Sequence, residues 1–481
     1  DLVSDCEREY VDFENALRSQ EYDEELINEL RAIVTDWCSG FDLAEGFKPC
    51  HGPGSISGFT GRLSPPDKHL VMATDPTLEY LQKYIGPLAD YAPFGLKPGL
   101  MRESELVCVP KSMISNRTIS REPASLQYFQ QGVRSAMLRF INRSPELRAH
   151  IRLDDQDASR ALCCEGSYFG EYATVDLSNA SDSNTRTLVY RVFGGCKSLQ
   201  FALCCTRSRV TLLRDGTPVP MEKFAPMGSA TCFVAMSVVL AAVCKLAISR
   251  TIRRYRDSGE RRPGISRKYL VYGDDIIVDS LVWDELRALL TALHFVVNTT
   301  KSYYVPAPVA NFREACGAEY MDGVDVAPMR IPRFFAGAQG YRSNAGVAVA
   351  SYVTFANNAY AHGMMCLRYA ILAELRRLVP LSRYLIFDTN GERGIRTSAD
   401  SCTNYHVKAR RGPYQTTQHR CVVLCAVKDC RTCRLYGRQV GRRARCPLDD
   451  GPARWDDVRL FEALLQSSCR DYVSTLDYNA G

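Results

Sequence analysis

The sequence has no long uninterrupted hydrophobic run, no visible internal repeat and no compact disulfide pattern. Its longest apolar stretch, residues 230–247, is broken by two hydroxyl residues and a lysine, so it is marginal for a membrane span and favours a core helix. No basic-then-apolar segment opens the chain, and we therefore expect no signal peptide. The sequence starts at Asp1 without a methionine, which leads us to expect a fragment or a processed product.

The cysteines are numerous but scattered. Twenty are present, with adjacent pairs at Cys163-Cys164 and Cys204-Cys205, and their spacing is not that of a small secreted disulfide scaffold. We expect reduced and mostly buried thiols. A structural zinc site is an alternative near the C-terminus, but only one pair there has CxxC spacing, so free cysteines on a basic segment are favoured. That candidate group comprises Cys421, Cys425, Cys430, Cys433, Cys446, His406 and His419.

Charge is only mildly unbalanced. The hydrophobic content of 46% and charged content of 24% are ordinary for a soluble globular protein. The net charge of +6 is compatible with a polyanionic partner without identifying one. Acidic residues concentrate in residues 1–30, and basic residues in 250–268 and 408–445, where a solvated surface is the alternative. A chain of 481 residues predicts two or three sub-domains that share a large core.

The most informative stretch is residues 268–280, where two adjacent aspartates separate two short β-branched runs. Such runs predict strands, and Gly273 permits a tight turn, so Asp274 and Asp275 are expected at the tip of a hairpin. Adjacent carboxylates repel each other unless a cation neutralises them, which makes the tip a candidate divalent-metal site. Taken alone, the pair fits a solvated acidic turn better, so its neighbours in the fold decide between the two.

A second pair of aspartates is associated with a predicted strand at residues 172–177: one lies near its end and the other follows it. Asp176 ends the apolar run, where a metal ligand would be held rigidly, and together with Asp274 it could bind two divalent ions. Asp182 comes six residues later among small polar residues. It is either a ligand-facing carboxylate or a helix N-cap, and both roles are compatible because a capping residue keeps one free oxygen.

Three further segments carry candidate phosphate contacts. Gly228 and Ser229 open a long predicted helix, residues 229–250, where glycine lets backbone N–H groups approach a ligand; Ser229 as a simple N-cap is the alternative. A basic segment carries Lys111, Arg117 and Arg121, and strand alternation places both arginines on one face that suits a triphosphate. Lys301 follows a predicted strand, and an isolated lysine of this kind is more often merely solvated.

The remaining pattern indicates alternating helices and strands. Residues 195–225 alternate like strands and end in a Gly-Thr-Pro turn, and the last hundred residues have weak periodicity. A basic strand is expected from residue 107 to 121 and a short one at 295–298. Helices are expected within 1–45 and at 125–142, 182–193, 282–293 and 350–378.

The motifs occur in the order basic strand, strand-end Asp, Gly-Ser helix, Asp-Asp hairpin and lysine, which resembles palm-domain nucleic-acid polymerases. More specifically, the region from about 45 to 335 resembles the replicase catalytic subunit of small positive-strand RNA bacteriophages, the Qbeta-like levivirus group. The blocks that carry the resemblance are His51-Gly-Pro-Gly, Val109-Pro-Lys, Arg117-Thr-Ile, Glu122-Pro, Asp176-Leu-Ser-Asn-Ala-Ser-Asp-Ser, Met227-Gly228, Tyr272-Gly-Asp-Asp-Ile-Ile, Val297-Asn-Thr, Phe312-Arg-Glu-Ala-Cys-Gly and Gly323-Val-Asp-Val-Ala-Pro.

The resemblance implies an α+β fold, a right-hand polymerase with fingers, palm and thumb whose antiparallel palm sheet is backed by helices. The implied domains are an N-terminal region and fingers at 1–170, palm at 171–187, a fingers insertion at 188–225, palm again at 226–335, and thumb with C-terminal elements at 336–481.

The resemblance also implies roles for individual residues. Asp176, Asp274 and Asp275 would hold two Mg²⁺ ions, for which Mn²⁺ could substitute. Lys111 and Arg117 would contact the triphosphate, with Arg121 beside them. Asp182 would sit near the ribose 2′-hydroxyl, and Lys301 matches a proposed general acid for pyrophosphate departure. Gly228 and Ser229 would border the nucleotide, although the family usually has Asn where this chain has Ser229.

The implied function is an RNA-dependent RNA polymerase that replicates a positive-strand viral RNA genome without a primer. Its partners would be RNA template and product, ribonucleoside triphosphates, and the host elongation factors Tu and Ts with a ribosomal protein. We expect no membrane association and a location in the cytoplasm of an infected bacterial cell. One alternative is a reverse transcriptase, but that class usually has a bulky aromatic gate where this chain has Ser178, Asn179 and Asp182. The other is a non-catalytic RNA-binding protein that keeps the fold.

Overall fold

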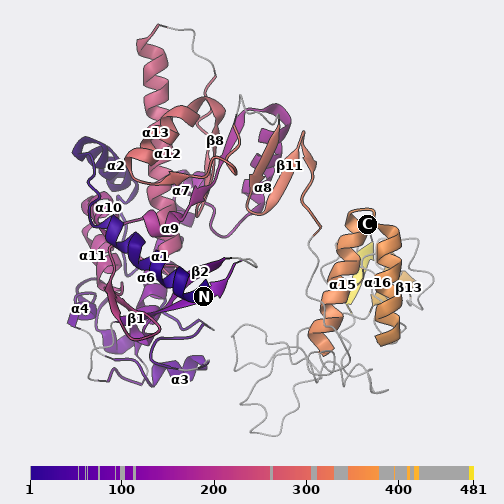
Figure 1. The fold of residues 1–481 in the computed structure, drawn as a ribbon, viewed down its shortest axis with the longest axis horizontal. Coiled ribbons are helices and arrows are strands. Elements are labelled where there is room, and N and C mark those ends of the chain that lie inside the picture. The colour runs from indigo at the N-terminus through magenta and orange to yellow at the C-terminus, as the bar shows by residue number, and fades with distance from the viewer. Residues whose placement is uncertain are drawn as a thin grey trace. The chain divides into compact units, whose positions relative to one another are not determined.

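The computed structural model describes residues 2–329 with short gaps (53, 60, 62, 74–75, 93, 98–102, 112–114, 260–263 and 305–310), and then 345–378, 395, 409–411, 417–421 and 476–480. The chain divides into two compact units, Asp1–Ala327 and Pro328–Gly481. Figure 1 shows the helices and strands of each unit in order of sequence.

The first unit mixes helices and short strands. Its α-helices are α1 (Leu2–Leu17), α2 (Glu24–Trp37), α3 (Pro65–His69), α4 (Pro76–Glu79), α5 (Gln82–Ile85), α6 (Ala124–Arg143), α7 (Pro145–His150), α8 (Asp157–Phe169), α9 (Ala180–Ser183), α10 (Arg186–Val192), α11 (Lys197–Cys205), α12 (Cys232–Asp257) and α13 (Trp283–Ala292). Single 3₁₀ turns form η1 (Leu88–Tyr91), η2 (Phe193–Gly195) and η3 (Ser280–Val282). Its strands are β1 (Glu103–Pro110), β2 (Asn116–Arg121), β3 (Tyr172–Val175), β4 (Leu177–Ser178), β5 (Val210–Leu212), β6 (Pro218–Pro220), β7 (Leu270–Tyr272), β8 (Asp275–Asp279), β9 (Val296–Val297), β10 (Phe312–Ala315), β11 (Ala318–Met321) and β12 (Val324–Asp325).

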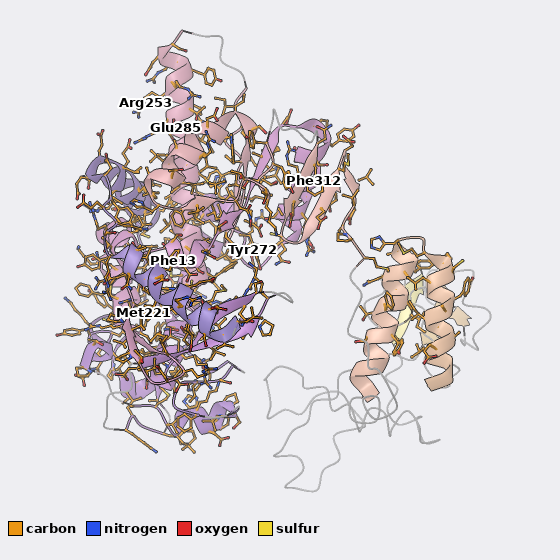
Figure 2. The ribbon with its side chains drawn as sticks, viewed as in Figure 1. Phe13, Met221, Arg253, Tyr272, Glu285 and Phe312 are labelled. Atoms are coloured by element: carbon orange, nitrogen blue, oxygen red, sulfur yellow. The ribbon has the colours of Figure 1, made fainter. Side chains whose placement is uncertain are left out.

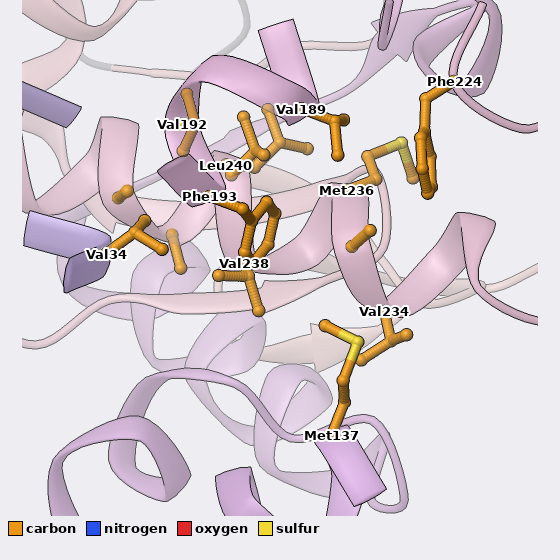
Figure 3. Packing of buried hydrophobic residues seen from close by; sticks show 14 of the residues in the cluster. Val34, Met137, Val189, Val192, Phe193, Phe224, Val234, Met236, Val238 and Leu240 are labelled. Atoms are coloured by element: carbon orange, nitrogen blue, oxygen red, sulfur yellow. The ribbon is translucent and has the colours of Figure 1, made fainter. Parts of the chain in front are cut away.

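The core of this unit is built around α12. The helix is long and apolar enough to cross a membrane, but 83% of its most apolar window is buried inside the protein, as expected for a core helix. Figure 3 shows Val234, Met236 and Val238 of α12 among side chains from α2, α6 and α10. Because α12 is apolar on nearly every side, it can be packed by other elements all around, and it fixes the position of whatever lies at its N-terminal end.

An antiparallel sheet of order β3-β8-β7 packs beside α12. Val175 pairs with Ile276 and Tyr272 pairs with Asp275, so the predicted hairpin is present and its loop is only Gly273 and Asp274. Helix α8 packs against all three strands, and α12 contacts β7. The β-branched residues of β3 and β8 are buried between these layers, which explains why so short a sheet is stable.

A second sheet has the order β2-β1-β5-β6 and is covered by α1. The predicted basic strand is in fact a pair of antiparallel strands, with Val109 opposite Arg117. The Ser120 backbone N–H donates to the Met227 carbonyl oxygen at 2.7 Å, so β2 is docked on the loop that leads into α12. A third small sheet, β10-β11-β12, packs on α8.

Several predicted elements differ from the observed ones. Residues 197–205 form helix α11 rather than a strand, because Leu199, Ala202 and Leu203 are buried at helical spacing. The predicted helix 182–193 is two helices, since the Thr185 hydroxyl accepts from the Leu188 N–H at 3.1 Å and starts α10 afresh.

Two further predicted helices have different bounds. Helix α12 starts later than predicted, at Cys232, and continues through the arginine-rich run to Asp257, because long arginine side chains extend into solvent without breaking a helix. The predicted helix 350–378 is interrupted near Gly363, whose φ of 68° ends the first of two helices.

The second unit contains α15 (Ala345–Ala361) and α16 (Met365–Leu378), which pack on each other. Strands β13 (Ala409–Arg411), β14 (Thr417–Cys421) and β15 (Leu476–Ala480) form an antiparallel sheet in the order β13-β14-β15. The candidate zinc group lies outside the described side chains. None of the thirteen cysteines that the structure describes is in a disulfide, and most are partly or fully buried, as expected.

Candidate active site

The tip of the β7–β8 hairpin is fixed by the first turns of α12. Gly273 has a φ of 66°, and a Cβ there would run into the ring of Phe233. Its N–H donates to the Ser237 hydroxyl at 3.1 Å. Glycine is therefore required for both conformation and space, and the hairpin presents Asp274 at a defined place.

Asp176 lies in a break between β3 and β4, directly across from this tip. Its backbone N–H donates to the Ser302 hydroxyl at 3.1 Å, and its carbonyl oxygen accepts from the Asn298 N–H at 3.0 Å. The Asn298 side-chain amide also donates to Oδ2 of Asp176 at 3.0 Å. The Ser302 hydroxyl donates to the Asp176 carbonyl oxygen at 3.4 Å. The segment that carries Lys301 therefore holds Asp176 through four hydrogen bonds, and the second carboxylate oxygen is available to a ligand.

One pocket of about 1010 Å³ unites most of the predicted site residues. Its walls come from α1, β2, the 176–182 segment, the start of α12, the hairpin tip and the loop after β9. Of the ten predicted residues, all but Asp275 and Arg121 line it: Asp176, Asp274, Lys301, Lys111, Arg117, Asp182, Gly228 and Ser229. Motifs spread over nearly two hundred residues of sequence thus converge on one cavity.

The two aspartates of the hairpin tip are electrostatically strained. Burial raises the pKa of Asp274, and the charge of Asp176 raises it further, while Arg117 and Lys111 act in the opposite direction. Burial and the neighbouring Asp274 raise the pKa of Asp275 to about 6. A cation between Asp176 and Asp274 would offset this repulsion.

The donor set fits a divalent metal ion. Across the described residues, no three His, Cys, Asp or Glu side chains are gathered closely enough to enclose a metal by themselves. Asp176 and Asp274 would supply two carboxylates, and the rest of the shell would be left to water and substrate oxygens. That is how Mg²⁺ is usually bound, because it keeps several waters and takes only one or two protein carboxylates.

Two predicted site residues lie beside the pocket rather than in its wall. Asp275 is the first residue of β8, and one of its carboxylate oxygens accepts from the Cys316 N–H at 3.3 Å. Arg121 forms an ion pair with Glu105 at 2.5 Å, directly across the β1–β2 pairing. Asp275 thus links the hairpin to the residue after β10, and Arg121 is paired with a glutamate of the neighbouring strand β1.

Asp182 does not cap a helix; it lies inside α9, whose N-cap is Asn179. Its Oδ1 accepts from the ammonium of Lys223 at 2.8 Å. Lys223 is only 1% exposed, and its Nζ also lies 3.4 Å from Glu14 of α1 and 3.9 Å from the ring centre of Tyr10. A buried lysine therefore holds Asp182 in place and ties it to the N-terminal helix.

The loop before α12 brings backbone close to β2. Gly228 has a φ of 110°, and a Cβ there would collide with the Ser120 carbonyl. Ser229 is not an N-cap, because the helix starts at Cys232; its hydroxyl lies 3.2 Å from that of Thr231. Glycine at 228 is thus needed for the close approach of this loop to the basic strand.

The sequence analysis did not predict that α1 forms a wall of the pocket. It also did not predict that Lys223 binds Asp182 or that Asn298 binds Asp176. Pocket-lining residues of α1 include Glu9, Tyr10 and Phe13. A signal was present: Cys6, Tyr10, Glu14 and Leu17 form the buried stripe of α1, and a glutamate within an otherwise apolar stripe indicates a buried partner. Lys223 had no comparable signal, since it sits in an irregular segment.

Comparisons with known proteins identify the family to which this chain is similar. The family model described as RNA replicase, beta-chain matches residues 6–337. The chain is 32% identical over 262 residues to the RNA-directed RNA polymerase subunit beta of Enterobacteria phage SP, which covers 54% of this chain and 41% of that protein. It is also 32% identical over 250 residues to the corresponding subunit of Escherichia virus Qbeta, covering 51% and 36%. The match spans about two fifths of the length of these relatives.

A solved structure supports the fold independently. The RNA-dependent RNA polymerase of a human picorbirnavirus superposes with a TM-score of 0.50 at 10% identity, covering 78% of this chain and 74% of that one. At this identity the likeness concerns the fold alone. The fold is therefore α+β, of the right-hand polymerase class, as predicted.

Proposed function

Because the chain belongs to the RNA replicase beta-chain family, we propose that it is an RNA-directed RNA polymerase that copies a positive-strand viral RNA genome, starting without a primer. One observation carries the proposal: Asp176 and Asp274, from two different parts of the chain, share one pocket with Lys111, Arg117 and Lys301. Carboxylates and basic side chains in one cavity are what nucleotidyl transfer requires.

We propose that Asp176 and Asp274 hold two Mg²⁺ ions, with Asp275 supporting Asp274 from behind, and that Mn²⁺ can substitute. Bound there, the ions would lower the pKa of the attacking 3′-hydroxyl and neutralise the triphosphate. Among the protein's own groups, Lys111 and Arg117 on the basic strand would bind and orient the phosphates, since both line the cavity. Lys301 lines the same cavity and is our candidate for donating a proton to the departing pyrophosphate.

Selection of ribonucleotides would fall to Asp182. Lys223 occupies one oxygen of its carboxylate, and Asp182 lines the pocket, so the remaining oxygen can accept from a ribose 2′-hydroxyl. Gly228 would allow the sugar or template backbone to approach closely. A reverse transcriptase, the first alternative, would need a bulky side chain here, where this chain has Ser178 and Asn179.

The decisive test is RNA synthesis by the full chain on a defined RNA template with Mg²⁺ and all four ribonucleotides. We expect Asp274→Asn to lower the rate at least about a hundredfold, as for loss of other preorganised charge in active sites. Glu319→Gln, which removes an acidic group outside the pocket, is the matched control and should leave the rate unchanged. Unaltered synthesis by Asp274→Asn would refute the metal assignment.

The same assay separates the alternatives. Replacing ribonucleotides by deoxyribonucleotides should abolish synthesis, whereas efficient deoxyribonucleotide incorporation would favour a reverse transcriptase. RNA binding without any synthesis, in the presence of host extract, would favour a non-catalytic RNA-binding protein.

We further propose that the chain acts as one subunit of a larger replicase in the cytoplasm of an infected bacterium. The beta-subunit names of its relatives suggest this, and the host elongation factors Tu and Ts with a ribosomal protein are our candidate partners. Co-purification from the host tests the idea, and a lone subunit with full activity would contradict it. Residues 1–170 would form an N-terminal region and fingers, 188–225 a fingers insertion, 171–187 and 226–335 the palm, and 336–481 the thumb and C-terminal elements.

A further inference from the structure

A second pocket, of about 460 Å³, lies in the first unit and shares no residue with the first one. It is bordered by α7, by the C-terminal half of α12 and by the segment that leads into β7. Figure 2 shows Arg253 near the C-terminal end of α12, with Tyr272 of the hairpin on a separate part of the unit. Nothing in the proposed polymerase chemistry uses this pocket.

Its rim is basic, and most of this charge is uncompensated. Arg253 and Arg256 stand one turn apart on α12, and Arg267 enters from the segment before β7. Within the described part of the chain, Arg253 and Arg267 have no acidic partner, and Arg256 pairs only with its exposed neighbour Asp257. The acidic residue of the rim, Glu146, is already paired with Lys245 at 2.6 Å. Three guanidinium groups therefore border one small cavity with little neutralisation from the protein itself.

Two stacked aromatic rings form part of the pocket lining. Tyr269 lines the pocket and is only 2% exposed, and its hydroxyl is buried with no hydrogen-bond partner in the described structure. Its ring stacks on that of His150, with centres 3.8 Å apart and planes within 2°, and the Tyr269 carbonyl lies 3.0 Å from Nδ1 of His150. The stacked pair therefore holds Tyr269, two residues after Arg267, in a fixed position at the pocket.

We propose that this pocket binds a phosphate of an RNA strand and so forms a second RNA contact, away from the catalytic cavity. Guanidinium forks match the oxygens of a phosphate in charge and geometry, and three of them border this cavity. A cavity of about 460 Å³ is large enough for a phosphate with its sugar. The folded surface of an acidic protein is too broad to enter it. A free nucleotide offers the same phosphate chemistry and is the other source that the test must separate.

The test measures binding of the full chain to a fluorescent single-stranded RNA of about ten nucleotides, within the usual site size of single-strand binding domains, by anisotropy and without nucleoside triphosphates. The variant Arg253→Ala/Arg267→Ala should weaken binding at least about tenfold at low salt and reduce the log–log salt slope by about 1.4, the release expected from two phosphate contacts on a single strand. The matched control is Arg254→Ala/Arg287→Ala, which removes the same charge from α12 and α13 outside the pocket. Equal weakening by both pairs would refute the proposal, because the effect would then be one of overall charge.

A cross-linking measurement locates the contact. An RNA bearing 4-thiouridine should cross-link to the peptide that contains Tyr269, a residue of the pocket lining. If the arginine variant lost binding of labelled ATP but kept its RNA affinity and lacked this cross-link, the phosphate would come from a nucleotide, and the RNA contact would be wrong. The proposal would fail equally if poly-glutamate, rather than RNA, depended on these arginines. Because RNA synthesis is not measured, the outcome is independent of the proposed polymerase activity.

Discussion

At the scale of single residues, the pocket depends on a buried charge, Lys223, that lies outside every sequence block quoted above. Lys223 is enclosed by Asp182, Glu14 and Tyr10, and among the described residues no other cation forms an ion pair with either carboxylate. Glu14 in turn accepts the Glu222 N–H at 2.7 Å. Loss of the ammonium would leave two carboxylates facing each other in a desolvated place, so the position of Asp182 depends on Lys223.

We predict that Lys223→Met lowers the free energy of unfolding by about 3–5 kcal/mol, the usual cost of breaking a buried ion pair from one side. Urea denaturation followed by circular dichroism measures the change. The double variant Lys223→Met/Glu14→Gln removes one charge of each sign and should recover at least about 1 kcal/mol of that loss through coupling. Strictly additive losses would show that the two side chains do not interact.

The same variants report on function. If Lys223 positions Asp182, Lys223→Arg should keep the preference for ribonucleotides over deoxyribonucleotides, while the double variant should fold yet lose much of that preference. A double variant that folds and discriminates as the wild type does would mean that Lys223 has a purely structural role. Arg186→Ala, which removes an exposed ion pair with Glu222 nearby, is the matched control.

At the scale of elements, a buried lysine anchors the glycine-rich loop that begins at His51. Lys68 is fully buried, and its ammonium donates to the carbonyls of Gly52, at 2.6 Å, and of Gly54. His51, at the start of the loop, packs against His69 and Tyr128 with ring centres 4.6 and 4.8 Å away. Burial, followed by the positive charges of His69 and Lys68, lowers the pKa of His51 to about 3.

This arrangement predicts acid sensitivity. The folded state keeps His51 neutral, while the unfolded chain binds a proton near the ordinary histidine pKa of about 6.5. The unfolded state therefore binds more protons between about pH 6.5 and 3, so stability present above pH 6.5 is lost as the pH falls through that window. In thermal melts from about pH 7.5 to 5, which spans the ordinary histidine titration, we expect His51→Phe to show a shallower loss of melting temperature than the wild type. Parallel curves would mean that His51 is not the group responsible.

The elements that sequence could predict are those with a strong local signal. The β7–β8 hairpin, the strand that ends at Asp176 and the glycine before α12 follow from alternation and turn chemistry within a few residues. Helix α11 was not predicted because it has only nine residues. Over so short a run its apolar residues fit the two-residue period of a strand as well as the 3.6-residue period of a helix. The contribution of α1 could not be predicted, since Glu14 meets Lys223 from 209 residues away in sequence, and only tertiary packing brings them together.

At the scale of the whole molecule, every residue that lines the 1010 Å³ pocket belongs to the first unit, from Cys6 to Lys301. The largest hydrophobic cluster of described residues also lies within that unit, from Tyr22 to Phe295. A unit that contains its own core should fold alone. Under the proposed function, we therefore expect nucleotide binding to need only the first unit.

We therefore predict that a fragment of residues 1–329 unfolds in one cooperative thermal transition and binds a fluorescent ATP analogue with Mg²⁺. Its dissociation constant should be within about threefold of that of the full chain, a difference below about 1 kcal/mol, because the whole pocket wall is retained. Lys111→Ala in the fragment is expected to weaken this binding, whereas Lys83→Ala, at a lysine outside the pocket, should not. A fragment that melts without a cooperative transition, or that binds the analogue equally well with and without Lys111, would contradict the assignment of both the folding unit and the nucleotide pocket to residues 1–327.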